Sequence, residues 1–183
     1  MRSLIITYDK FQDHEVIYPY YRLTEEGEVS IMADKIGTIH GILGCNMKSH
    51  ISIEQLEFED SYQHYLNRFD LLVIPGGVKA MEKIRQNKKV IQFIKDWHEN
   101  TGKVIASTCS GAQLLISAKI VKGKRLSAYY AMRDDVENAG AIYIDDPVVV
   151  DGNIVSSPHY DFMGPWLSTA IDMVKNGNTI RNS

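Results

Sequence analysis

Cys109 is the residue of this chain whose sequence setting most clearly indicates chemistry. It stands at the centre of Ser107-Thr108-Cys109-Ser110-Gly111, after the apolar run 104–106 and before the helix-like segment 113–116. A nucleophile with small neighbours between a strand and a helix is typical of a strained turn at a sheet edge. The start of the following helix would favour the thiolate over the thiol. We therefore predict a reactive cysteine, the alternative being an inert buried one.

A second candidate segment, Pro75-Gly76-Gly77, stops the apolar run 69–74. At the end of a buried strand, glycine backbone can direct an N–H group toward a developing oxyanion, together with the N–H of Ser110. A plain tight turn is the alternative for this Gly-Gly pair.

The six histidines and two cysteines show no HExxH, CxxC or other compact ligand spacing, so we expect no metal and no cofactor. His159 follows Ser156-Ser157 at the end of another apolar run and is a possible acid or base. The alternative is an ordinary loop histidine. Cys45 is expected to be structural, with both thiols free.

These residues require a scaffold of alternating strands and helices. The apolar runs 3–7, 29–33, 69–74 and 104–106 predict strands. Residues 37–53 and 148–155 are typical of hairpins, the second turning on Asp151-Gly152. Helices are predicted over 15–26, with Pro19 in or near the first turn, and over 88–100, 113–116, 133–139 and 162–174.

The alternation predicts one α/β domain over residues 1–176, with 177–183 as a frayed tail. Its expected architecture is a doubly wound, mostly parallel sheet sandwiched by helices, of the flavodoxin-like kind. Such sheets bind ligands beyond the carboxyl ends of their strands. Gly76, Gly77 and Cys109 all fall on that edge, which makes it the predicted site.

Composition excludes several classes of function. The 183 residues are 44% hydrophobic with a net charge of −3, so the chain can bury a core and offers no cationic surface for nucleic acid. The first apolar run is too short for a signal-peptide core, and no run is long enough to span a bilayer. We expect a cytoplasmic protein without nucleic-acid or membrane partners.

In its ordered set of motifs, the chain resembles the ThiJ/PfpI (DJ-1/PfpI) superfamily, which shares the fold of class I glutamine amidotransferases. The resemblance is to the PfpI-type intracellular peptidase branch and extends over nearly the whole length. It is carried by residues 11–20, 72–77, 133–135, 138–140, 148–153 and 155–157.

The resemblance implies roles for individual residues. Cys109 is the family's reactive cysteine, and Glu15 is the carboxyl packed beside its sulfur; a carboxyl against a thiolate tends to keep its proton. Tyr129 matches a position near the cysteine and is a candidate to bind a substrate oxygen, or an interface aromatic. The chain departs from the peptidase pattern because Ser110 occupies the family's histidine position. Glu82 matches a glutamate that the family brings to that histidine from a neighbouring subunit; the alternative is an ordinary acid on a helix surface.

Three functions follow as hypotheses. The leading one is a cysteine-dependent hydrolase or lyase of small reactive carbonyl compounds, similar to a glyoxalase or deglycase, with Cys109 as nucleophile and Glu15 as proton carrier. The second is an intracellular cysteine peptidase, and the third a non-catalytic redox-sensing stress protein or holdase. The partners expected are a small-molecule substrate or peptide, and further copies of the chain in a homodimer or larger homo-oligomer.

Overall fold

The computed structural model describes residues 1–181, with side chains described through residue 177. A seven-stranded sheet runs in the order β10-β11-β7-β6-β1-β2-β5 and is parallel except for β10. Its strands are β1 (Arg2–Ile6), β2 (Glu28–Ala33), β5 (Ile51–Ser52), β6 (Leu71–Ile74), β7 (Val104–Thr108), β10 (Val149–Asp151) and β11 (Ile154–Ser157). This confirms the predicted doubly wound α/β sheet.

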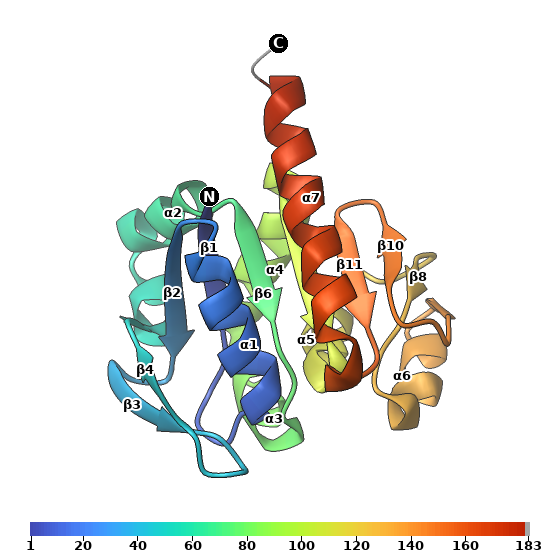
Figure 1. Ribbon diagram of the computed structural model, residues 1–183, viewed down its shortest axis with the longest axis horizontal. Helices are drawn as coiled ribbons and strands as arrows, with labels where there is room; N and C mark the ends of the chain where they lie inside the picture. The colour runs from blue at the N-terminus through green and yellow to red at the C-terminus, as the bar shows by residue number, and fades with distance from the viewer. Residues whose placement is uncertain (182–183) are drawn as a thin grey trace.

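Helices cover both faces of the sheet. They are α1 (Asp13–Thr24), α2 (Glu59–Arg68), α3 (Val78–Ile84), α4 (Lys88–Asp96), α5 (Ala112–Ser117), α6 (Arg133–Asn138) and α7 (Met163–Arg181). In Figure 1, α1 and α7 lie side by side in front of the sheet, and they pack on each other. On the other side, α4 packs against α2 and α5. Both faces of the central strands are therefore covered.

The central strands are mainly apolar because neither face of the sheet meets water. All four residues of β6 are fully buried, as are Leu4, Ile5 and Ile6 of β1. β1 pairs with β2 on one side and β6 on the other. After β1 the next strand, β2, is added on one side of it, whereas β6 and β7 are added on the other side. The strand order therefore reverses between β1 and β6, and at such a point sheets of this type open a crevice for ligands.

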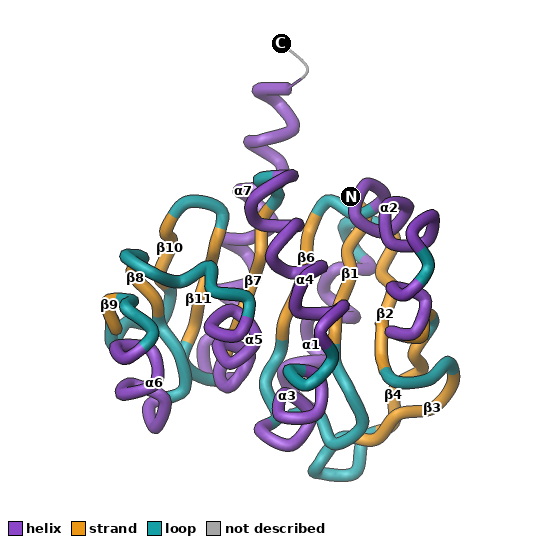
Figure 2. The backbone as a smooth tube through the Cα atoms, turned by 180° about the vertical axis from the view of Figure 1, so that it is seen from behind, coloured by secondary structure: helices purple, strands orange, loops and turns teal. Residues whose placement is uncertain are grey.

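Two small strand pairs complete the fold. The predicted hairpin layer is β3 (Gly37–His40) with β4 (Asn46–Ser49), which pair antiparallel. The second pair is β8 (Arg125–Leu126) with β9 (Ile142–Tyr143). The β3–β4 hairpin and α3 lie at the edge toward which the strand arrows point in Figure 1, and Figure 2 shows the same placement from behind.

Two helices differ from the sequence prediction. Because α1 begins at Asp13, Pro19 lies inside it, where it has no N–H for the carbonyl of Glu15. The predicted first-turn placement is wrong. The last helix continues to Arg181 and projects beyond the sheet (Figures 1 and 2), so residues 177–181 are helical where we expected a frayed tail. Residues 182–183 of that predicted tail lie outside the described residues.

The described residues lack two features, a membrane-spanning helix and a cluster of metal ligands. None of their helices combines the length and apolarity that crossing a bilayer requires. They also contain no group of three or more His, Cys, Asp or Glu side chains placed to hold a metal ion.

Candidate active site

Cys109 lies at the carboxyl end of β7, where the chain turns through a 3-10 segment, Cys109–Gly111, into α5. Its φ is 55°, a left-handed conformation that is unfavourable for a residue with a β-carbon. Gly111 lets the turn pack on the main chain, since a β-carbon there would lie 2.6 Å from the Ile74 carbonyl oxygen. The result is the predicted strand–turn–helix arrangement, with the cysteine half-buried at the sheet edge.

Glu15 reaches the same place from the first turn of α1. Its side chain is fully buried, and Oε2 accepts a 2.5 Å hydrogen bond from the Gly76 N–H. Glycine is required at position 76, because a β-carbon would collide with Glu15 Oε2 and lie 3.0 Å from Cys109 Sγ. Three loops, after β1, β6 and β7, thus bring carboxyl, glycine and thiol together.

The carboxyl and the thiol perturb each other's protonation. Burial raises the pKa of Glu15 to about 7, although the hydrogen bond from Gly76 opposes this shift. Burial, and next the Glu15 carboxylate, raise the pKa of the Cys109 thiol to about 12, while the Ser110 N–H acts in the opposite direction. Burial and the Glu15 carboxylate thus oppose the thiolate that the helix start favours, because two anions in contact cannot both be solvated. Both groups are therefore protonated below pH 7, and above pH 7 a Glu15 carboxylate lies beside a neutral Cys109 thiol.

The raised pKa of Glu15 makes a prediction about stability. A buried carboxyl with a folded pKa of about 7 against an ordinary 4.5 stabilises the fold in its neutral form, and this contribution disappears as pH rises through 7. Relative to Glu15→Gln, the wild-type free energy of unfolding should fall by roughly 3 kcal/mol between pH 4.5 and pH 8. Urea unfolding of both proteins across this range measures it.

A matched control for this experiment is Glu82→Gln, because Glu82 is an exposed acid on α3. Its stability relative to wild type should stay constant over the same pH range. Parallel pH curves for wild type and Glu15→Gln would contradict the raised pKa.

A pocket of about 410 Å³ opens onto the pair. Among the residues predicted from the sequence, its lining includes Glu15, Gly77, Cys109, Tyr129 and His159. Ser110 is buried behind the cysteine, and its Oγ makes no hydrogen bond within the described residues. The remaining walls were not predicted: Gln12, Ile42, Leu43, Val78 and Tyr160.

The pocket-lining residues that the sequence did not predict are mainly apolar and aromatic. Ile42 and Leu43 come from the β3–β4 connection and are 53% and 65% exposed. The glycines on either side of this pair, Gly41 and Gly44, indicate a turn, but nothing local in the sequence places that turn beside a cysteine 66 residues further on. Only the sheet topology makes that connection.

His159 and Tyr129 lie in the pocket wall, though neither side chain is hydrogen-bonded to Cys109 within the described residues. His159 stacks closely on Tyr160, with ring centroids 3.8 Å apart, and its Nδ1 lies 3.1 Å from Asp161 Oδ2. The Tyr129 N–H donates to the Cys109 carbonyl oxygen at 3.2 Å, so this backbone bond fixes the turn from the other side. Glu82 lines a different pocket, with Arg85 and Asp135.

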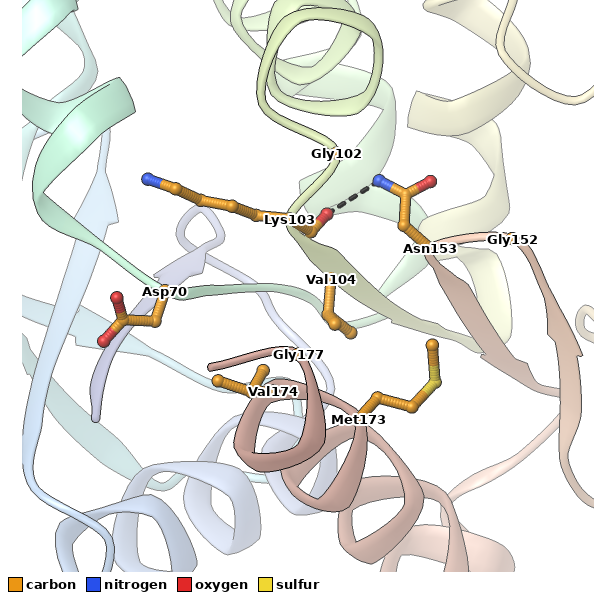
Figure 3. A pocket seen from close by; sticks show the side chains of 9 residues that line it. All are labelled: Asp70, Gly102, Lys103, Val104, Gly152, Asn153, Met173, Val174 and Gly177. Carbon is orange, nitrogen blue, oxygen red and sulfur yellow. Dashed lines mark hydrogen bonds between the residues drawn. The ribbon is translucent and has the colours of Figure 1, made fainter. Parts of the chain in front are cut away.

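Another pocket, of about 340 Å³, lies at the opposite end of the strands (Figure 3). It is bordered by Asp70 before β6, Lys103 before β7 and Asn153 before β11. The Asn153 amide donates to the Lys103 carbonyl, and the Lys103 ammonium donates to the carbonyls of Leu66, Asn67 and Phe69. These hydrogen bonds hold together the segments that precede β6, β7 and β11.

Comparison with known proteins identifies relatives of this arrangement. Residues 1–172 match the DJ-1/PfpI family. The chain is 38% identical over 176 residues to deglycase PfpI of Pyrococcus furiosus, covering 96% of this chain and 100% of that protein. It is 32% identical over 151 residues to protein/nucleic acid deglycase 2 of Escherichia coli, covering 81% and 82%.

A solved structure has the same fold. The ThiJ/PfpI domain protein from Brachyspira murdochii superposes with a TM-score of 0.84 at 20% identity, covering 96% of each chain. Together with the family match over nearly the whole length, these relatives show that the chain belongs to the DJ-1/PfpI family.

Proposed function

We propose that this protein is a cysteine-dependent enzyme acting on small reactive carbonyl compounds or their adducts, in the manner of a glyoxalase or deglycase. The observation that carries the proposal is the pair of Glu15 and Cys109, opening together into a pocket of about 410 Å³. Two of its relatives are named deglycases. An aldehyde suits this pair, because adding a thiol to a carbonyl expels no leaving group.

The first step uses the proton of the Cys109 thiol. Glu15 as carboxylate takes the proton of the Cys109 thiol while the sulfur bonds to the aldehyde carbon, and the carbonyl electron pair moves onto oxygen. Glu15 then returns the proton to that oxygen, which gives a neutral hemithioacetal. The Gly77 N–H is the better oxyanion donor of the two glycines, because the Gly76 N–H is already bonded to Glu15.

For a dicarbonyl such as methylglyoxal, the hemithioacetal can proceed to product without an external oxidant. Its C1 hydrogen leaves as a proton and a proton is added at the former ketone carbon, so that C1 is oxidised and C2 is reduced. The resulting thioester is hydrolysed by water to a hydroxy acid, which regenerates the thiol. Glu15 is placed to carry these protons, since it is the carboxyl in contact with the thiol.

The peptidase alternative finds less support in the pocket. The PfpI-type peptidase pattern has a histidine directly after the cysteine to help expel the amine, and Ser110 stands in its place. His159 lines the pocket but is engaged by Asp161 and Tyr160. The redox-sensor alternative needs an easily ionised thiol, whereas burial and Glu15 raise the pKa of Cys109.

The test compares substrates on one protein. In a Cys45→Ser background, so that alkylation reports Cys109 alone, the enzyme should consume methylglyoxal, and stoichiometric iodoacetamide should abolish this. Cleavage of a fluorogenic peptide should be no faster before alkylation than after it. Methylglyoxal loss at the same rate with native and alkylated protein would refute the proposal, and alkylation-sensitive peptide cleavage would favour the peptidase instead.

A further inference from the structure

Asp13 is a buried carboxylate that the proposed reaction does not use. It is the first residue of α1, two positions before Glu15, and only 2% of its surface is exposed. Its Oδ2 accepts the Leu43 N–H at 2.7 Å and its Oδ1 accepts the Cys45 N–H at 2.8 Å. Both donors belong to the connection between β3 and β4, which we call the 41–45 loop (Gly41–Cys45).

The 41–45 loop is closely fitted to this carboxylate. The Gly41 N–H donates to the Cys45 carbonyl at 2.8 Å, and the Ile42 N–H donates to the Phe11 carbonyl at 3.0 Å. A β-carbon on Gly41 would collide with Asp13 Oδ1. The loop therefore wraps around the Asp13 side chain, with the glycine at the point of closest approach.

Hydrophobic burial contributes little to the placement of the loop. Its residues from Ile42 to Cys45 are all exposed, so their side chains are not anchored in the core. The loop is held mainly by hydrogen bonds, of which the two to Asp13 have a charged acceptor and are the stronger kind. Removing that acceptor should release the loop while the sheet and core remain intact.

The position of the loop matters for access to the cysteine. Ile42 and Leu43 line the pocket onto which Glu15 and Cys109 open. Leu43 also borders a neighbouring apolar pocket of about 660 Å³, together with Tyr160. The loop thus contributes Leu43 to the lining of both spaces.

We propose that Asp13 is a positioning residue that holds the 41–45 loop as a wall of the Cys109 pocket and so sets the size of electrophile that reaches the thiol. Small, narrow carbonyl compounds pass this wall, and bulky ones are excluded. The inference about substrate size rests on the proposed function. The inference about access to the sulfur does not.

The experiment measures access without turnover. In the Cys45→Ser background, the labelling rates of Cys109 by N-ethylmaleimide and by the bulky N-pyrenylmaleimide are compared, since both react by the same chemistry. Asp13→Asn replaces one acceptor oxygen by an NH₂ group that faces an N–H donor. The rate with N-ethylmaleimide divided by the rate with N-pyrenylmaleimide should fall by about tenfold. The loop moves away from the pocket, and this speeds the reaction of the bulky reagent most.

Two further variants keep the result decisive. Gly41→Ala perturbs the same contact from the loop side and should lower the ratio in the same direction, so it decides the matter if Asp13→Asn fails to fold. Asp9→Asn is the matched control, because Asp9 accepts the His40 N–H from the same hairpin at 2.9 Å but does not line the pocket. Its ratio should equal that of wild type.

If Asp13 only stabilised the fold and did not position the loop, the outcome would differ. Thermal unfolding would shift, but the two maleimide rates would change by the same factor. An unchanged ratio in folded Asp13→Asn, or in Gly41→Ala, overturns the proposal. In Asp13→Asn and Gly41→Ala, the preference in kcat/KM for methylglyoxal over the bulkier phenylglyoxal should weaken along with the labelling ratio. If wild type turns over neither aldehyde, the proposed function fails while the labelling ratio still tests the wall.

Discussion

Replacing Cys109 with alanine is expected to lower kcat/KM for methylglyoxal by about 10³-fold or more, since no covalent adduct can form without the sulfur. The backbone turn should survive, because it is held by main-chain contacts of Gly111 and by the bond from the Tyr129 N–H to the Cys109 carbonyl. Steady-state consumption of methylglyoxal, with intact mass to detect the adduct in wild type, measures the effect.

Cys45→Ala is the matched control for this loss. Cys45 is an exposed cysteine on the 41–45 loop. The variant loses the hydrogen bond between its thiol and Asp13 but keeps its N–H, which also binds Asp13. Activity within about twofold of wild type is expected, because surface substitutions of this kind disturb little. Substantial activity remaining in Cys109→Ala would instead show that the sulfur is not the nucleophile.

Replacing Glu15 with glutamine is expected to lower kcat/KM by roughly 10²-fold or more, the usual contribution of a positioned acid or base. The carboxylate form is the one that accepts the thiol proton. With the pKa of Glu15 raised to about 7 by burial, wild-type kcat/KM should therefore rise as pH increases through 7. Profiles of kcat/KM from pH 5 to 9 measure this rising limb, which should be missing in Glu15→Gln.

The exposed acid on α3 again provides the control. Glu82→Gln should keep both the rate and the rising limb, because within one chain Glu82 lines a different pocket. If the limb persists in Glu15→Gln, another group accepts the proton. Loss of the limb together with a loss of activity in Glu82→Gln would indicate a contribution from a neighbouring copy of the chain.

Local sequence patterns were sufficient for the turn at Cys109. The buried strand, the small flanking residues and the helix that follows are adjacent in the chain, so their spacing alone predicts the arrangement observed. The buried strands and the hairpin over β10 and β11 were predictable for the same reason. Each depends on neighbours within about a dozen residues.

The partner of Cys109 could not be found in that way. Glu15 lies 94 positions earlier, and by itself it is an ordinary acid in a helix's first turn; only the family resemblance indicated its role. The effect of burial on the Cys109 thiol could not be found locally, because a helix terminus is visible in a sequence whereas burial beside a carboxyl is not. The loop walls and the engagement of the Gly76 N–H by Glu15 likewise depend on tertiary packing.

The order of elements in the sheet also determines when the site can exist. Its parts follow β1, β6 and β7, which are adjacent in the sheet but distant in the chain, and such non-local pairings are slow steps in folding. A chain emerging from the ribosome exposes Glu15 long before Cys109 has been synthesised. The cysteine therefore meets the Glu15 carboxyl only once the central strands have paired, and partly folded molecules carry an ordinary thiol that lacks this partner.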